Sequence, residues 1–240
     1  MPSINIPILM YHSIESMPKS TVMRSLHVPP RKFKFQMWIL KILGYRGLSI
    51  KQLKPYLDGD KIGKVVGITF DDGYQNVLLN AAPVLKKYNF SATCYIVSES
   101  IGSSNIWDLK HGITQRPLMT EIEINEWLKM GMDIGAHTKT HPDLTAISKI
   151  KAKMEISDCK SALEKMYKVE INDFCYPFGR FNDVVSTMVQ DSGYLTATSM
   201  QRGRVNSKSN SYSLPRIPIN HRTLASLFLL KILTKYEDRR

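Results

Sequence analysis

The sequence alternates short apolar runs with longer amphipathic segments, and this alternation limits the possible fold more than any other feature. The run 65–70 is rich in β-branched residues, as in a strand that is buried on both faces. In 33–43, by contrast, apolar residues recur at helical spacing. Repeated strand–helix units of this kind build a mostly parallel sheet or barrel. We therefore expect an α/β fold.

The pattern also predicts where individual elements lie. The expected strands are 6–11, 65–70, 92–97, 132–136, 173–176 and 195–199. The expected helices are 33–43, which ends before Gly44, then 75–88, a segment from Thr120 to Lys129 with a capping box at Glu123, 147–167 and 182–191. The polar stretch 99–117 is expected to be a long surface loop. No stretch resembles a linker, so residues 1–240 are expected to form one domain.

The charge balance narrows the possible partners. Lysine and arginine outnumber aspartate and glutamate by 33 to 21, which gives a net charge of +12. The resulting positive field attracts phosphates, anionic glycans or acidic lipid headgroups. Because the basic residues are not interleaved with aromatic residues as in a nucleic-acid-binding module, no nucleic-acid partner is expected.

The cysteines and the apolar segments bear on location. Three widely spaced cysteines fit neither a disulfide framework nor a clustered zinc site, which favours a reducing compartment. No secretory signal and no transmembrane segment is visible, so we expect a cytoplasmic protein or one peripheral to the membrane, with export possible if a leader is missing from this chain. The basic stretch 224–240 has an apolar stripe that fits either a core helix or a helix lying on an anionic membrane.

Two adjacent aspartates follow the buried run 65–70. Side chains of neighbouring residues point in different directions, so Asp72 can bind a metal ion while Asp71 acts on a water molecule. The alternative is a simple turn in which Asp71, Asp72 and Gly73 cap the following helix.

A pair of histidines follows the run 132–136. His137 and His141 are four residues apart, a spacing that allows both imidazoles to bind one ion. Pro142 disfavours a helical conformation at His141, so a constrained loop is expected. Together with Asp72, the two imidazoles would leave coordination positions open, which is typical of a catalytic metal site.

A metal ion at such a site polarises an amide carbonyl and lowers the pKa of water toward about 7. In this interpretation Asp71 accepts the proton of the attacking water. The departing amine then needs a proton, and His12, which directly follows an apolar run, is the candidate donor. A histidine that only caps the strand end is the alternative for His12, and His221 is the reserve candidate.

These motifs resemble those of the polysaccharide deacetylase family, which is carbohydrate esterase family four and is also called the NodB homology domain. The resemblance covers most of the chain. Residues 69–73 resemble the first motif, in which Asp71 would be the base and Asp72 a metal ligand, and 137–142 resemble the second, which supplies His137 and His141 as metal ligands. It implies a distorted (β/α) barrel and a divalent metal ion, most commonly zinc, with cobalt or nickel as alternatives.

The third family motif is similar to Tyr176, Pro177, Phe178 and Gly179. The resemblance implies that its aromatic residue lines the substrate groove and that a backbone amide, here that of Phe178, helps to hold the oxyanion.

Two departures from the family pattern point to one branch. Cys175 occupies the position of an arginine that usually orients the base, and the usual late histidine motif is missing. Both features resemble the permuted branch of poly-N-acetylglucosamine deacetylases, in which His12 would supply the acid and Arg216 the missing arginine. A surface arginine is the alternative for Arg216.

The expected function is therefore a metal-dependent hydrolase that removes an acetyl group from an N-acetylated sugar of a bacterial glycan or glycan precursor. One alternative is a cytoplasmic deacetylase of a lipid-linked or nucleotide-linked sugar. Another is a non-catalytic carbohydrate-binding domain, which the missing arginine leaves open.

Overall fold

The computed structural model describes residues 5–206 and 208–239. The strands are β1 (Asn5–Ile6), β2 (Ile8–Tyr11), β3 (Arg46–Leu48), β4 (Val65–Phe70), β5 (Thr93–Ile96), β6 (Asp133–Ala136), β7 (Asp173–Cys175), β8 (Thr196–Arg202), β9 (Val205–Asn206) and β10 (Leu214–Pro218). The α-helices are α1 (Pro30–Ile42), α2 (Ile50–Leu57), α3 (Gln75–Asn80), α4 (Ala82–Lys87), α5 (Glu121–Lys129), α6 (Lys149–Tyr167), α7 (Asp183–Asp191) and α8 (Ala225–Leu233).

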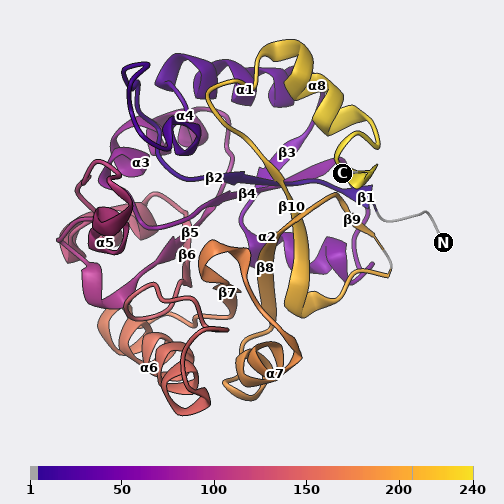
Figure 1. Ribbon diagram of the computed structural model, residues 1–240. Helices are drawn as coiled ribbons and strands as arrows, with labels where there is room; N and C mark the ends of the chain where they lie inside the picture. The colour runs from indigo at the N-terminus through magenta and orange to yellow at the C-terminus, as the bar shows by residue number, and fades with distance from the viewer. Residues whose placement is uncertain (1–4, 207, 240) are drawn as a thin grey trace.

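The main sheet of the described residues is entirely parallel and closes on itself. Its strand order is β2-β10-β8-β7-β6-β5-β4-β3, and β2 also pairs with β4 from Ile8 opposite Gly67 to Tyr11 opposite Phe70. This last pairing joins seven strands into a barrel, while β3 pairs with the first half of β4. Figure 1 shows the strands at the centre and the helices around them. The expected α/β barrel is confirmed.

Local signals placed several elements correctly. All six residues of β4 are buried, as the apolar run predicts for a strand covered on both sides. Both hydrogen bonds of the predicted capping box join Thr120 and Glu123 at the start of α5. Helix α1 ends at Ile42, and Gly44 follows with φ of 75°, a conformation that glycine adopts without strain.

Proline interrupts two of the predicted elements. The predicted helix 75–88 consists of two short helices, α3 and α4, because Pro83 lacks a backbone N–H and fits only in the first turn of a new helix. The predicted strand 6–11 is likewise divided at Pro7, so that β1 pairs with β9 and β2 enters the barrel. The predicted loop 99–117 contains a 3-10 helix, η3, at Ile106–His111.

Several elements were not predicted from the sequence, among them β3, α2, β9 and β10. Strand β3 and helix α2 are short, and strand β10 contains Pro215 and Pro218, which disfavour a strand in the interior of a sheet. The register of β10 against β8 shifts between Leu214 and Arg216, so Pro215 lies where the ladder is already irregular. Strand β10 carries Arg216, one of the residues singled out in the sequence.

The apolar stripe of the C-terminal segment belongs mainly to the core. Phe228 and Ile232 of α8 are buried in the large hydrophobic cluster of the molecule, whereas Leu224 is 59% exposed at the start of the helix. The core-helix interpretation of this stripe therefore holds for its buried part. Within the described residues, no helix combines the length and the apolar character needed to cross a bilayer.

Candidate active site

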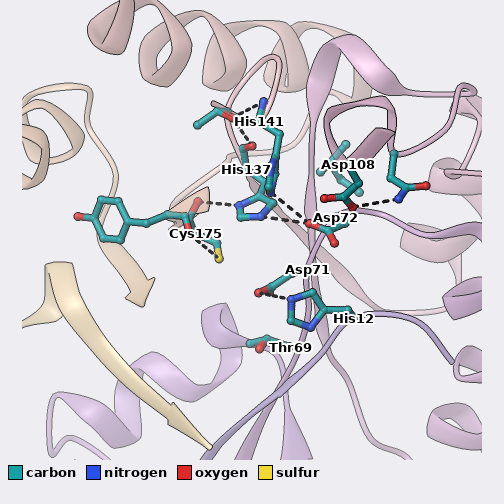
Figure 2. A network of polar contacts seen from close by, with 12 residues as sticks. His12, Thr69, Asp71, Asp72, Asp108, His137, His141 and Cys175 are labelled. Carbon is teal, nitrogen blue, oxygen red and sulfur yellow. Dashed lines mark hydrogen bonds and ion pairs between the residues drawn. The ribbon is translucent and has the colours of Figure 1, made fainter. Parts of the chain in front are cut away.

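The polar groups singled out in the sequence gather at one rim of the barrel. Because all barrel strands are parallel, their carboxyl ends lie together. His12 follows β2, Asp71 and Asp72 follow β4, and His137 follows β6. Figure 2 shows these side chains converging. They line a cavity of about 1130 Å³, to which His141 and Phe178 also contribute.

Asp72, His137 and His141 have the geometry of a metal-binding group. The Oδ1 atom of Asp72 lies 3.4 Å from the Nε2 atom of each histidine, and the three ligand atoms are all within 4.8 Å of one another. All three residues are buried. Asp72 and His141 have positive φ values of 75° and 63°, which are uncommon for residues other than glycine and are found where a site over-determines the backbone.

The ring of His137 is oriented for metal binding. Its Nδ1 atom lies 2.7 Å from the backbone oxygen of Cys175. A carbonyl oxygen can only accept, so Nδ1 carries the proton and the lone pair of Nε2 faces Asp72. The ring of His141 is held by packing. It stacks on the ring of Trp107 with a centroid distance of 4.5 Å, and it forms a T-shaped pair with the ring of Phe178 with a centroid distance of 4.7 Å.

The charges in this group are mutually dependent. Burial alone would raise the pKa of Asp72, but without a metal ion a proton on Nε2 of His137 or His141 donates a hydrogen bond to the carboxylate, and this outweighs burial and holds that pKa well below its usual value. Burial lowers the pKa of His141. A buried carboxylate facing two imidazole nitrogens attracts a divalent cation in place of the protons. The donor set therefore fits the expected ion.

A second set of possible ligands, formed by Asp71, His137 and Cys175, also lies within 4.8 Å. Arg216 makes this set unsuitable for a cation. Its guanidinium group binds both carboxylate oxygens of Asp71, and its Nη2 atom lies 3.3 Å from the sulfur of Cys175. A permanent positive charge at this position repels a second cation.

Arg216 and Asp71 form a buried two-point ion pair. The distances are 2.6 Å from Nη1 to Oδ1 and 2.8 Å from Nη2 to Oδ2. Arg216 is only 1% exposed and also donates to the backbone oxygen of Ser199 and the hydroxyl of Thr69, so it is not a surface arginine. Although burial raises the pKa of Asp71, the adjacent Arg216 lowers it below its usual value and keeps the carboxylate ionised.

The two candidate acid histidines lie in different places. The Nε2 atom of His12 is 3.8 Å from Oδ2 of Asp71, and its ring lines the cavity with a side-chain exposure of 16%. His221 is not among the residues that line this cavity, and its backbone oxygen accepts a hydrogen bond from Lys32. The structure therefore brings His12, and not His221, to Asp71.

The third motif forms a tight turn beside the metal-binding group. Tyr176 is buried, and its hydroxyl donates to the backbone oxygen of Tyr212 at 2.8 Å. Phe178 has φ of 57° and is 40% exposed, and both Phe178 and Tyr176 line the cavity. Pro177 lies between them at the first position of the turn.

Helix η3 supplies cavity residues that sequence reasoning missed. Trp107 packs on His141, and the buried carboxylate of Asp108 accepts a hydrogen bond from Asn105 at 3.0 Å. Burial raises the pKa of Asp108, and the nearby charge of Asp72 acts in the same direction. A lone tryptophan and aspartate in a polar stretch have no distinctive spacing, so no local signal identified them.

Comparisons with known proteins agree with this geometry. The profile of the family described as polysaccharide deacetylase matches residues 58–197. The chain is 32% identical over 225 residues to the Bacillus subtilis protein named "Putative polysaccharide deacetylase YxkH", a match that covers 93% of this chain and 74% of the relative. The chain belongs to the polysaccharide deacetylase family, and it is an enzyme of the carbohydrate esterase class.

Two further similarities extend over nearly the whole chain. A poly-β-1,6-N-acetyl-D-glucosamine N-deacetylase of Staphylococcus epidermidis is 28% identical over 218 residues, covering 87% of this chain and 73% of the relative. The structure of the Streptococcus pyogenes deacetylase PplD in complex with acetate superimposes with a TM-score of 0.83 at 28% identity, covering 96% of this chain and 99% of that one. Both matches extend beyond the family profile, which includes neither His12 nor Arg216.

Proposed function

We propose that this protein hydrolyses the N-acetyl group of an N-acetylated sugar in a bacterial glycan, with a divalent ion held by Asp72, His137 and His141. One observation carries the proposal: a carboxylate and two imidazoles converge on one point, directly beside a second carboxylate that a buried arginine keeps charged. This arrangement combines a cation site with a base in one cavity.

The metal would supply the electrophilic part of the reaction. A divalent ion bound to these three residues polarises the acetyl carbonyl and lowers the pKa of a water molecule. Two nitrogens and one oxygen suit zinc, and they also accept cobalt or nickel. Zinc is our first choice because it is the family's common metal.

The protein's own side chains would move the protons. Asp71 accepts a proton from the attacking water, and the ion pair with Arg216 both keeps Asp71 ionised and fixes its orientation. His12, which lies 3.8 Å from Asp71, donates a proton to the departing amine. The backbone amide of Phe178 helps to stabilise the negative charge on the carbonyl oxygen. Both proposed proton-transfer groups thus lie in the same cavity.

The cavity and the relatives favour a glycan substrate. A cavity of about 1130 Å³ is much larger than one acetamido group, so it has room for the sugar and its neighbours. The relative from Staphylococcus epidermidis is named for poly-β-1,6-N-acetyl-D-glucosamine, and the structure of PplD was determined with acetate, which is the product of deacetylation. The buried position of Arg216 beside Asp71 argues against the non-catalytic alternative.

The proposal can be tested by acetate release. The parent chain and Asp71→Asn would be incubated with N-acetylglucosamine oligomers and added zinc, and acetate and bound metal would be measured. We expect Asp71→Asn to retain the metal and to lose about 10²- to 10⁴-fold in rate, because it lacks the base. Asp58→Asn, a change of an exposed carboxylate in an ion pair with Lys54, is the matched control. Acetate release by Asp71→Asn at the parent rate would contradict the assignment.

A substrate panel separates the remaining alternatives. Mass spectrometry would follow the loss of one acetyl group from oligosaccharides, lipid-linked sugars and nucleotide-linked sugars. Turnover of the oligosaccharides above the other two classes supports the glycan proposal. Exclusive turnover of a lipid-linked or nucleotide-linked sugar would replace it with the precursor alternative.

A further inference from the structure

We propose that Asn76 is a positioning residue for His12, and that it holds the acid-bearing segment in place against the helix that follows the aspartate pair. The inference rests on the proposed function, in which His12 is the general acid. Asn76 does not reach the cavity itself, since it is not among the residues that line it. Its role would be to fix where the imidazole of His12 lies relative to Asp71.

The segment that carries His12 needs such support because regular structure ends before it. Strand β2 stops at Tyr11, whose backbone oxygen accepts a hydrogen bond from the Asp71 N–H at 3.0 Å. Beyond that point residues 12–14 have no continuous ladder, and a single bridge joins Ser13 to His27. Ser13 and Ile14 are nevertheless completely buried. The position of His12 therefore depends on how its two following residues are held.

Asn76 holds both of these residues with one side chain. Its Oδ1 atom accepts a hydrogen bond from the backbone N–H of Ile14 at 2.8 Å, and its Nδ2 atom donates to the hydroxyl of Ser13 at 2.9 Å. Helix α3 begins at Gln75, three residues after Asp72. One amide group thus links the segment of the proposed acid to the segment of the base and the metal ligand.

A second asparagine extends the same contact. Asn80 lies one helical turn after Asn76, so both side chains are on one face of α3. Its Nδ2 atom donates to the backbone oxygen of Ile14 at 2.8 Å. Both polar groups of the Ile14 backbone are therefore bound by side chains of α3, a specific arrangement for a segment without regular structure.

His27 supports Ser13 from the opposite side. Its Nδ1 atom lies 2.8 Å from the hydroxyl of Ser13, and its own ring is buried. Because burial lowers the pKa of His27 to about 4, the ring is neutral at neutral pH, and its Nδ1 atom can accept a hydrogen bond from the Ser13 hydroxyl. The hydrogen bonds then run in one direction, from Asn76 to Ser13 to His27.

Accurate placement matters because proton transfer requires hydrogen-bond reach to the departing nitrogen. A displacement of about 1 Å can lower a rate by about 100-fold. Replacing Asn76 with alanine would leave the buried N–H of Ile14 without its partner and would release one side of Ser13. The substitution leaves Asp72, His137 and His141, which would hold the metal, in place.

The test compares two acetyl donors that differ in their need for an acid. An amine must be protonated as it departs from an N-acetylglucosamine oligomer, whereas 4-nitrophenyl acetate releases a stabilised phenolate without a proton. We expect Asn76→Ala to lower kcat for the oligomer by about 10- to 100-fold and to change ester hydrolysis by less than about threefold. Bound metal should equal that of the parent. A merely structural role would lower both activities together.

Controls keep the result specific. Gln75→Ala changes the neighbouring residue of α3, whose side chain binds Glu123 of α5 instead, and it should alter neither activity. In a His12→Ala background, Asn76→Ala should add no further loss, because the acid that it positions is gone. Asn80→Ala removes only the contact to the Ile14 oxygen and should show the same selectivity with a smaller loss.

The outcomes are distinguishable. Equal losses on the oligomer and the ester in Asn76→Ala, or no loss on the oligomer, overturn the positioning role. If Asn76→Ala does not fold, equal losses in Asn80→Ala overturn it instead. If His12→Ala retains full activity on the oligomer, the acid assignment of the proposed function falls, and the positioning role falls with it. If His12→Ala loses only the oligomer activity while Asn76→Ala loses none, the positioning role alone is wrong.

Discussion

Replacing Arg216 with methionine should destabilise the fold and inactivate the enzyme by the same physical route. The side chain forms a two-point ion pair with Asp71 and donates to Thr69 and Ser199, all in a buried environment. Methionine fills much of the volume but provides no positive charge and no donor. Asp71 would then be a buried carboxylate without its counter-charge.

The size of the effect follows from the burial of the pair. Two unit charges about 4 Å apart attract by about 4 kcal/mol at an effective dielectric constant of about 20. Removing one partner of a buried pair lowers stability by about 3 to 5 kcal/mol, because the other charge stays buried and unpaired. For a chain of this size, that loss corresponds to a fall in Tm of roughly 6 to 20 °C. Arg216→Lys should recover only part of it, because an ammonium group cannot bind both carboxylate oxygens in this geometry.

A double-mutant cycle tests this reasoning by urea denaturation at fixed zinc concentration. Arg216→Met, Asp71→Asn and the combined variant would be compared with the parent. If the unpaired charge is responsible, the double variant should be more stable than the sum of the single losses implies, with a coupling energy above about 1.5 kcal/mol. A loss below about 1 kcal/mol for Arg216→Met, or additive single losses, would refute the ion-pair account.

Three further predictions concern other parts of the molecule. Asp173 has a pKa raised by burial from 3.8 to about 6, so the folded state binds the proton of this carboxyl group more tightly than the unfolded state does. Ionisation of Asp173 therefore lowers the free energy of unfolding. This loss is absent below pH 4, grows as pH rises to about 6 and then stays at about 3 kcal/mol. Asp173→Asn should therefore increase stability to urea at pH 7.5 but not at pH 4, and equal gains at both pH values would contradict this. His141→Ala should reduce bound metal at least tenfold by elemental analysis, and full occupancy would exclude His141 as a ligand. In Gly179→Ala the new Cβ would lie 2.4 Å from Cβ of Met200, so Tm should fall by several degrees more than in Gly59→Ala, whose Cβ meets nothing within 4 Å.

The sequence by itself determined the parts of the site that lie within one loop. Asp71 and Asp72 are adjacent, and His137 and His141 are four residues apart, so covalent distance alone keeps each pair together. Hydrophobic periodicity likewise placed β4 and most of the longer helices, because an element that is buried on one or both faces needs apolar residues at a regular spacing. The family motifs contained the same local information.

Only the tertiary structure determined which distant residues lie close to the two aspartates and the two histidines. Arg216 binds Asp71, which is 145 positions away in the chain. It lies on β10, a strand that was not predicted because it contains two prolines. His12 approaches Asp71 only because β2 pairs with β4 and closes the barrel. Asn76 meets the segment after His12 only because α3 packs beside that segment. Contacts of this kind depend on strand order and barrel closure, which involve distant segments together, and a residue that takes part in them has no characteristic spacing in its own neighbourhood.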